Sequence, residues 1–318
     1  MKRINYDLLN KTNDKKNFED GYKAIFNKEL SAKESEWTAW KNTNDPNGML
    51  KESVEELLTA DFHQLVGVYK RFIALNVKDT KKDKNGKNVK SDQYVELEKI
   101  FNYTSGYDAK IAEFFIKWAE KLEIRSCYYC EMSYVNTYTI LDNTGTTVVK
   151  KRRFDLDHFL PKGKCPCVGL SLYNFVPSCQ VCNSRIKLDY MPNVDYNDYE
   201  LISPTSANAE FDKNITVRLR LSPTGKYLLA GRYIYLKAQS PYRQYVDFFH
   251  LNERYSFHKP EAERIKKLKD RYPQSKIRKI ANLLGLREKE VEEDIFNLQY
   301  LKEKGRCFEK FTRDLLMK

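Results

Sequence analysis

Residues 126–134 read SCYYCEMSY, and residues 154–187 read FDLDHFLPKGKCPCVGLSLYNFVPSCQVCNSRIK. These stretches contain two C-x-x-C pairs, Cys127 with Cys130 and Cys179 with Cys182. Two thiolates at this spacing can bind one face of a tetrahedral ion, and two such pairs complete a closed zinc site. We therefore expect a structural zinc ion that joins the two stretches. The alternative is four reduced thiols without a metal.

The other three cysteines have weaker claims to a metal. Cys165 and Cys167 form a C-x-C pair, but the proline between them restrains the backbone, so we interpret them as small apolar side chains rather than ligands. Cys307 has no cysteine near it and is predicted to pack in the core. The count of seven is odd, and the N-terminus has no apolar signal segment. We therefore expect no disulfide scaffold and a cytoplasmic location.

The composition narrows the class of protein. The chain of 318 residues suggests about two domains. Its 22 Tyr and 17 Phe exclude a disordered chain, and it has no apolar run long enough for a membrane-spanning helix. The net charge of +12 favours a polyanionic partner, which we expect to be nucleic acid.

The order of the patterns predicts an α+β fold with four regions. We expect a helical, charged region at 1–92, a helix followed by a central module at 93–190, a β-rich extension at 191–240 and a helical region at 241–318. The helical regions flank the module that carries the cysteine pairs.

Apolar periodicity locates the main helices. Segment 52–75 recurs with helical spacing, and segment 108–124 places an apolar stripe on one face, with Asp108 as a plausible N-cap. The stripe consists of Ile111, Phe114, Phe115, Trp118 and Leu122. Segment 76–92 lacks periodicity and carries six lysines, so we expect a solvated loop. Trp37 and Trp40 are interpreted as core or docking residues rather than ligand contacts.

Strand-like runs occur on both sides of the second cysteine pair. Residues 134–141 and 146–154 are separated by the turn sequence DNTG at 142–145, which predicts a hairpin. Residues 214–222 and 226–238 are two further strand-like runs.

Four polar residues lie in order between or next to the cysteine pairs. Asp157 and His158 are adjacent on a predicted strand, Asn174 follows in an apolar run, and Asn183 comes directly after Cys182. With Pro161 after the Asp-His pair and basic residues after Asn183, this order resembles the HNH, or ββα-metal, endonuclease motif in its zinc-bearing form. The resemblance implies a central ββα-metal module with a structural zinc and a nuclease activity.

The residue types suit that chemistry. Phosphodiester hydrolysis needs a nucleophile and neutralisation of phosphate charge, and one divalent ion can supply the second. Asp157 and Asn183 offer oxygen ligands, which Mg²⁺ or Mn²⁺ prefer. A histidine with a pKa of about 6.5 can take a proton from water, so His158 is the predicted general base. The resemblance implies that Asn174 orients the segment carrying His158. The HNH motif often has His at the position of Asn183. The Asn of this chain keeps an oxygen ligand there.

Basic residues near the motif and in the tail are candidate phosphate contacts. Arg185 and Lys187 follow the second cysteine pair, where a solvated surface position is the equal alternative. Residues 259–280 carry nine Lys or Arg against three Asp or Glu, whereas residues 288–294 read EKEVEED and argue against a DNA-binding arm throughout. His250 and His258 lie outside the motif and are interpreted as structural histidines.

A wider resemblance covers most of residues 95–318. Segments 122–135, 170–183, 248–268 and 309–318 are similar to HNH proteins of Septu-type anti-phage systems, including retron-linked forms. The resemblance implies an ATPase of the ABC or SMC-like class as partner. The competing function is a catalytically inactive zinc module that binds nucleic acid or a protein. The presence of Asp157, His158, Asn174 and Asn183 together favours the nuclease.

Overall fold

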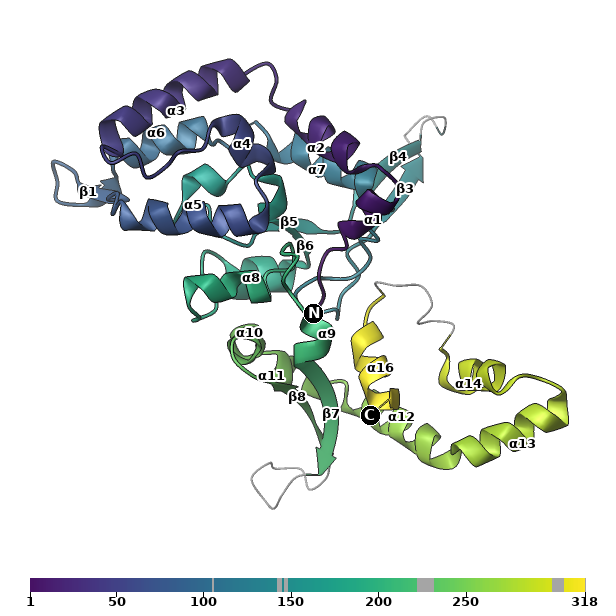
Figure 1. The fold of residues 1–318 in the computed structure, drawn as a ribbon. Coiled ribbons are helices and arrows are strands. Elements are labelled where there is room, and N and C mark those ends of the chain that lie inside the picture. The colour runs from purple at the N-terminus through teal and green to yellow at the C-terminus, as the bar shows by residue number, and fades with distance from the viewer. Residues whose placement is uncertain (105, 142–144, 146–147, 222–231, 299–305, 318) are drawn as a thin grey trace.

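The computed structural model describes residues 1–104, 106–141, 145, 148–221, 232–298 and 306–317. The fold is α+β, as expected from the sequence. Its strands form four separate two-stranded antiparallel sheets, β1–β2, β3–β4, β5–β6 and β7–β8, with helices around them (Figure 1). The predicted turn at 142–145 and the first part of the predicted strand at 226–238 lie outside the described residues, except for Gly145.

The N-terminal region is helical. Its elements are α1 (Asp7–Lys11), α2 (Lys15–Lys23), α3 (Leu30–Asn44), α4 (Val54–Thr59), α5 (Phe62–Ala74), β1 (Thr80–Lys82), β2 (Asn88–Lys90), α6 (Asp92–Ile100) and α7 (Asp108–Trp118). Trp37 and Trp40 are buried in the core, and so is the apolar stripe predicted for segment 108–124, although α7 itself ends at Trp118. Asp108 is the first residue of α7 rather than its cap, which is Tyr107.

Two local predictions in this region need correction. Segment 52–75 forms two helices, because Asp61 accepts a hydrogen bond from the N–H of Gln64 and starts a new helix with a capping box. Segment 76–92 contains the exposed hairpin β1–β2, with Thr80 opposite Lys90, instead of a loop alone. Apolar periodicity does not report such a hairpin, because neither strand buries a face.

The central elements carry the motif residues. They are β3 (Thr137–Leu141), β4 (Val148–Arg152), β5 (Asp155–His158), the 3-10 helices η1 (Pro166–Val168) and η2 (Leu172–Asn174), β6 (Phe175–Ser178) and the π-helix η3 (Val181–Lys187). β5 pairs with β6, with His158 opposite Phe175 and Asp155 opposite Ser178. The second cysteine pair therefore follows directly on β6.

The C-terminal part begins below this centre in Figure 1. Its elements are η4 (Tyr196–Asp198), α8 (Tyr199–Ile202), α9 (Phe211–Asn214), β7 (Ile215–Leu221), β8 (Arg232–Ala238), α10 (Tyr242–Phe248), α11 (Leu251–Ser256), α12 (Lys259–Arg271), α13 (Gln274–Leu284), α14 (Glu288–Phe296) and α16 (Glu309–Met317). Helices α13 and α14 extend away from the body and have a small core of their own around Ile277, Ala281 and Val291.

One hydrophobic core connects the rest of the molecule. It contains buried residues from each of the four regions expected from the sequence, from Met1 to Phe311. The regions therefore pack on each other, while their boundaries as domains stay a prediction. Among the described residues, no helix combines the length and the apolar character needed to cross a membrane.

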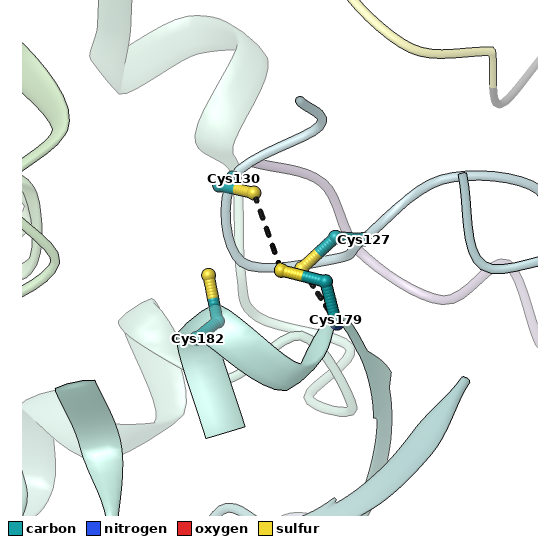
Figure 2. Close-up of side chains that lie close together, drawn as sticks. All are labelled: Cys127, Cys130, Cys179 and Cys182. Atoms are coloured by element: carbon teal, nitrogen blue, oxygen red, sulfur yellow. Dashed lines mark hydrogen bonds between the residues drawn. The ribbon is translucent and has the colours of Figure 1, made fainter. Parts of the chain in front are cut away.

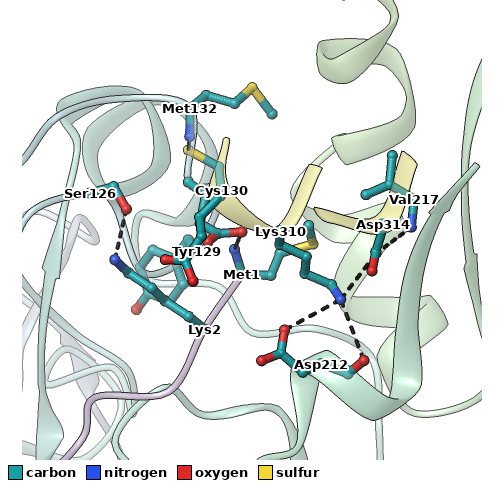
Figure 3. Close-up of polar contacts among 12 residues, drawn as sticks. Met1, Lys2, Ser126, Tyr129, Cys130, Met132, Asp212, Val217, Lys310 and Asp314 are labelled. Carbon is teal, nitrogen blue, oxygen red and sulfur yellow. Dashed lines mark hydrogen bonds and ion pairs between the residues drawn. The ribbon is translucent and has the colours of Figure 1, made fainter. Parts of the chain in front are cut away.

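Segments from both ends of the chain contact the first cysteine pair and β7 (Figure 3). The amino nitrogen of Met1 lies 3.1 Å from Oε2 of Glu131, and Lys2 donates to Oγ of Ser126 at 2.7 Å. On the other side, the N–H of Phe308, next to α16, donates to the carbonyl of Glu131 at 2.9 Å, and Asp314 of α16 accepts from the N–H of Val217 on β7 at 2.9 Å. These contacts fix the Cys127–Cys130 segment between residues that are distant in sequence.

Candidate metal centre and the polar site beside it

Four cysteines converge at one point, as Figure 2 shows. The sulfur atoms of Cys127, Cys130, Cys179 and Cys182 all lie within 4.8 Å of one another, and all four residues are buried. Cys130 and Cys179 are 4.0 Å apart, close to the ~3.8 Å edge of a tetrahedron built on Zn–S bonds of about 2.3 Å. The cluster is compatible with a structural metal such as zinc, as the two C-x-x-C pairs predicted.

Hydrogen-bond donors surround the sulfur atoms. The N–H of Met132 donates to Cys130 at 3.4 Å, and the N–H of Cys179 donates to Cys127 at 3.3 Å. The guanidinium of Arg254, on α11, donates to Cys182 at 3.3 Å. Four thiolates around a divalent ion leave a net charge of −2, so these donors suit a metal-bound state and hold the ligands in place.

The remaining cysteines do not join this cluster. Cys165 and Cys167 are fully buried, with their sulfur atoms 3.2 Å apart. Cys307 is buried as predicted, and burial raises its pKa to about 12. Among the described residues, the four-cysteine cluster is the only group of His, Cys, Asp or Glu side chains close enough together to hold a metal ion.

The acidic residues of β5 and Asn183 form a polar site next to the cluster. Asp155 and Asp157 are two residues apart on β5, so their side chains leave the strand on the same face. The amide nitrogen of Asn183 on η3 lies 3.3 Å from Oδ2 of Asp155, which leaves the amide oxygen of Asn183 as an acceptor. Sequence reasoning missed Asp155, although its spacing from Asp157 on a predicted strand was a signal for it.

Lys187 does not lie where the sequence suggested. Its side chain is 1% exposed, and its ammonium group donates to the carbonyl of His158 at 2.6 Å and lies 3.4 Å from Oδ2 of Asp157. The prediction of a surface contact with phosphate is therefore wrong for Lys187. The physical reason is that η3 packs against β5 and turns this position inward. Arg185 is exposed and stays a candidate contact.

Asp157 is held by two neighbours. Oδ2 accepts a hydrogen bond from the hydroxyl of Tyr129 at 2.5 Å, in addition to its contact with Lys187. Burial raises the pKa of Asp157, while the Lys187 ammonium and the Tyr129 hydroxyl act in the opposite direction. The carboxylate is therefore anchored inside the protein rather than exposed on a surface.

His158 is buried in an aromatic environment. Its ring packs edge-on against Tyr103 and in a tilted arrangement against Phe175, with both centroid distances at 4.7 Å. Nε2 lies 2.8 Å from the carbonyl oxygen of Gly169. A carbonyl only accepts, so the neutral ring carries its proton on Nε2 and its lone pair on Nδ1. Burial lowers the pKa of His158 to about 3, so the ring is neutral near pH 7.

Asn174 fixes the segment that follows His158. Its Oδ1 accepts from the N–H of Leu160 at 2.8 Å, and its Nδ2 donates to the carbonyls of Leu160 at 2.9 Å and Val168 at 3.0 Å. The side chain is completely buried. Asn174 thus makes hydrogen bonds of the kind the resemblance implied, and its catalytic role stays a prediction.

The motif residues form two groups. Asp155, Asp157, Asn183 and Lys187 meet on one side of β5, whereas His158 and Asn174 contact different neighbours, because successive side chains of a strand point to opposite faces.

Comparisons of the chain with protein-family models, with curated proteins and with solved structures find no match. A function for this site therefore rests on its residues and their geometry.

Proposed function

We propose that the chain is a metal-dependent endonuclease of the HNH type that hydrolyses phosphodiester bonds in nucleic acid, with DNA as the expected substrate. The observation that carries the proposal is that Asp157 and His158 end a strand whose partner leads into the second cysteine pair, and that Asn183 follows this pair directly. The four-cysteine cluster thereby joins the β5–β6 hairpin to η3, the helix that carries Asn183.

The donor atoms support a hard divalent ion. The carboxylates of Asp155 and Asp157 and the amide oxygen of Asn183 are the oxygen ligands that Mg²⁺ and Mn²⁺ prefer. Such an ion, when bound, would neutralise phosphate charge and stabilise the departing oxygen. The binding of Mg²⁺ or Mn²⁺ by these residues is itself part of the proposal.

The protein's own residues account for the proton transfer. Nδ1 of His158 has the lone pair that accepts a proton from the attacking water, while the bond from Nε2 to Gly169 fixes the ring. Asn174 holds the segment after His158 and acts as a positioning residue. The scissile phosphate must approach the end of β5, where Asp157 and His158 are adjacent. When water attacks phosphorus and the 3′ oxygen departs as the leaving group, the products carry a 5′-phosphate and a 3′-hydroxyl.

The test is cleavage of labelled DNA with Mg²⁺ or Mn²⁺ by the full chain. The His158→Ala protein is expected to lose on the order of 10²–10⁴ in rate while keeping its zinc and its affinity for DNA, because a general base acts only in the transition state. His63→Ala is a matched control, since this side chain is 77% exposed. If His158→Ala cuts as fast as wild type, the assignment of the base is wrong.

One observation favours the competing function of an inactive zinc module that binds nucleic acid or a protein. Lys187 already neutralises Asp157, and His158 points to the other face of β5. This alternative predicts binding without cleavage under every metal condition, with and without a partner protein.

The resemblance to anti-phage nucleases also suggests a partner. We propose that an ATPase of the ABC or SMC-like class acts with this chain as its nuclease effector. The reading frame adjacent to the gene identifies the candidate, and co-purification tests it. Cleavage assays should be run with and without that ATPase, because a nuclease that needs a partner would be silent alone.

A further inference from the structure

The strands β7 and β8 form a ribbon with one apolar and one polar face. Both strands have seven residues, and Val217 lies opposite Leu236 in the antiparallel register. Burial alternates over residues 215–218 of β7 and 233–238 of β8. The buried side chains are Ile215, Val217, Ile234 and Leu236. Because α11, α12 and α16 contact the ribbon, its apolar face is the one that packs on the body.

Side chains from two helices anchor the middle of the ribbon. Asp314 of α16 accepts from the N–H of Val217 at 2.9 Å, as Figure 3 shows, and Asn252 of α11 accepts from the N–H of Leu236 at 2.8 Å. Val217 and Leu236 are a cross-strand pair, so at this position the outward N–H group on each edge of the ribbon already has an acceptor. The ribbon is fixed in place, and a further strand cannot pair there without displacing these side chains.

The polar face combines cations with aromatic rings. Its side chains are Thr216, Arg218, Arg220, Tyr233, Tyr235 and Lys237. Arg218 lies opposite Tyr235, and Arg220 lies opposite Tyr233. The guanidinium of Arg220 is 5.1 Å from the ring centroid of Tyr235. Neither strand contains Asp or Glu.

The charges on this face are not neutralised locally. Among the described residues, Arg218, Arg220 and Lys237 form no ion pair with an acid. Arg218 also lines a small cavity of about 210 Å³ with Lys269 of α12, which extends the positive surface. The acids Asp270 and Asp314 line the same cavity, but Asp270 pairs with Lys266 and Asp314 with Lys310.

We propose that the polar face of β7–β8 binds single-stranded nucleic acid. Cations that alternate with aromatic rings suit an unpaired strand, because bases can stack on the Tyr rings while Arg and Lys contact phosphates. Paired bases hide their faces in the duplex and cannot use the rings in this way. The inference deepens the proposed nuclease function, since it assigns the substrate a contact surface on elements other than the candidate site.

The test measures binding rather than cleavage. Fluorescein-labelled 30-mers of single-stranded DNA, single-stranded RNA and duplex DNA are titrated with the full chain, without Mg²⁺, at several salt concentrations. Arg218→Glu/Arg220→Glu is expected to weaken single-strand binding tenfold or more. It should also reduce the slope of log affinity against log salt by about 1.4, because two phosphate contacts are lost. Tyr235→Leu should weaken binding at least about fivefold and leave that slope unchanged.

A charge-matched control separates this face from net charge. Lys16→Glu/Lys28→Glu changes the charge equally at two exposed residues of the N-terminal region and should affect binding little. Three outcomes would each overturn the proposal. They are equal losses of affinity in the two double variants, no binding of single-stranded DNA or RNA by wild type, and a preference of wild type for duplex DNA. Weakened binding in the ribbon variants, together with undiminished cleavage by His158→Ala, would refute the nuclease assignment of His158 and leave this inference standing.

Discussion

The ammonium group of Lys187 lies 3.4 Å from the carboxylate of Asp157, and both side chains are nearly inaccessible to solvent. Lys187 also donates to the backbone carbonyl of His158. One side chain of η3 therefore holds two adjacent residues of β5. This pairing joins the helix to the strand independently of the cysteine cluster, and it compensates a buried negative charge at the candidate site.

Removing this cation should be costly. Lys187→Met leaves the carboxylate of Asp157 buried without its partner, and breaking such a pair costs about 3–5 kcal/mol of the free energy of unfolding. Urea unfolding in zinc-containing buffer measures the loss. Arg185→Met, on the exposed side of η3, should change stability by less than about 0.5 kcal/mol. The pairing would be shown unimportant if both variants unfolded at the same urea concentration as wild type.

The cysteine cluster should couple metal binding to folding. Cys127→Ser or Cys182→Ser is expected to release the metal and unfold the central module, because a structural zinc site contributes its binding energy to folding. Metal content by mass spectrometry and thermal melting report the two effects. Cys165→Ser is the control and should keep the zinc. A folded wild-type protein that purifies without zinc would contradict this prediction.

Asn174 should matter for stability apart from any catalytic role. Asn174→Ala removes three hydrogen bonds and leaves the N–H and carbonyl of Leu160 without their partner. With a penalty of about 1–3 kcal/mol for each buried unsatisfied group, we expect a loss of roughly 3 kcal/mol or more. Chemical denaturation measures it, and Asn10→Ala at an exposed position serves as the control. A loss below about 1 kcal/mol would mean that water replaces the amide.

The buried imidazole of His158 predicts a specific pH dependence of stability. Its folded-state pKa of about 3 lies below the unfolded value of about 6.5, so between these values the unfolded chain binds more protons at this residue. This contribution is constant above pH 6.5. Below it, the free energy of unfolding should fall by up to about 1.4 kcal/mol per pH unit.

A paired measurement isolates this contribution. Unfolding free energies of wild type and His158→Gln are compared between pH 7.5 and 5.5, with zinc present. Other titrating groups are common to both proteins, so the difference between the two slopes reports His158. Parallel pH profiles would mean that His158 titrates normally in the folded state.

The sequence alone determined the features that depend on local spacing. Two thiols in a C-x-x-C segment are held near each other by the chain itself, so the four ligands of the candidate zinc site could be named in advance. The stripe of α7 was readable because helical periodicity directly reports which face is buried, as Phe115 and Trp118 illustrate. The break at Asp61 was missed, because apolar periodicity continues across a cap.

Only the tertiary structure decided which polar groups meet. Asn183 faces Asp155 and Lys187 turns inward because η3 packs against β5, and that packing depends on residues 28 or more positions apart in the chain. The outward face of β7–β8 likewise became defined only when helices from the C-terminal region covered its apolar side. Spacing along the chain fixes neighbours on one element, whereas burial and charge pairing depend on which elements come together.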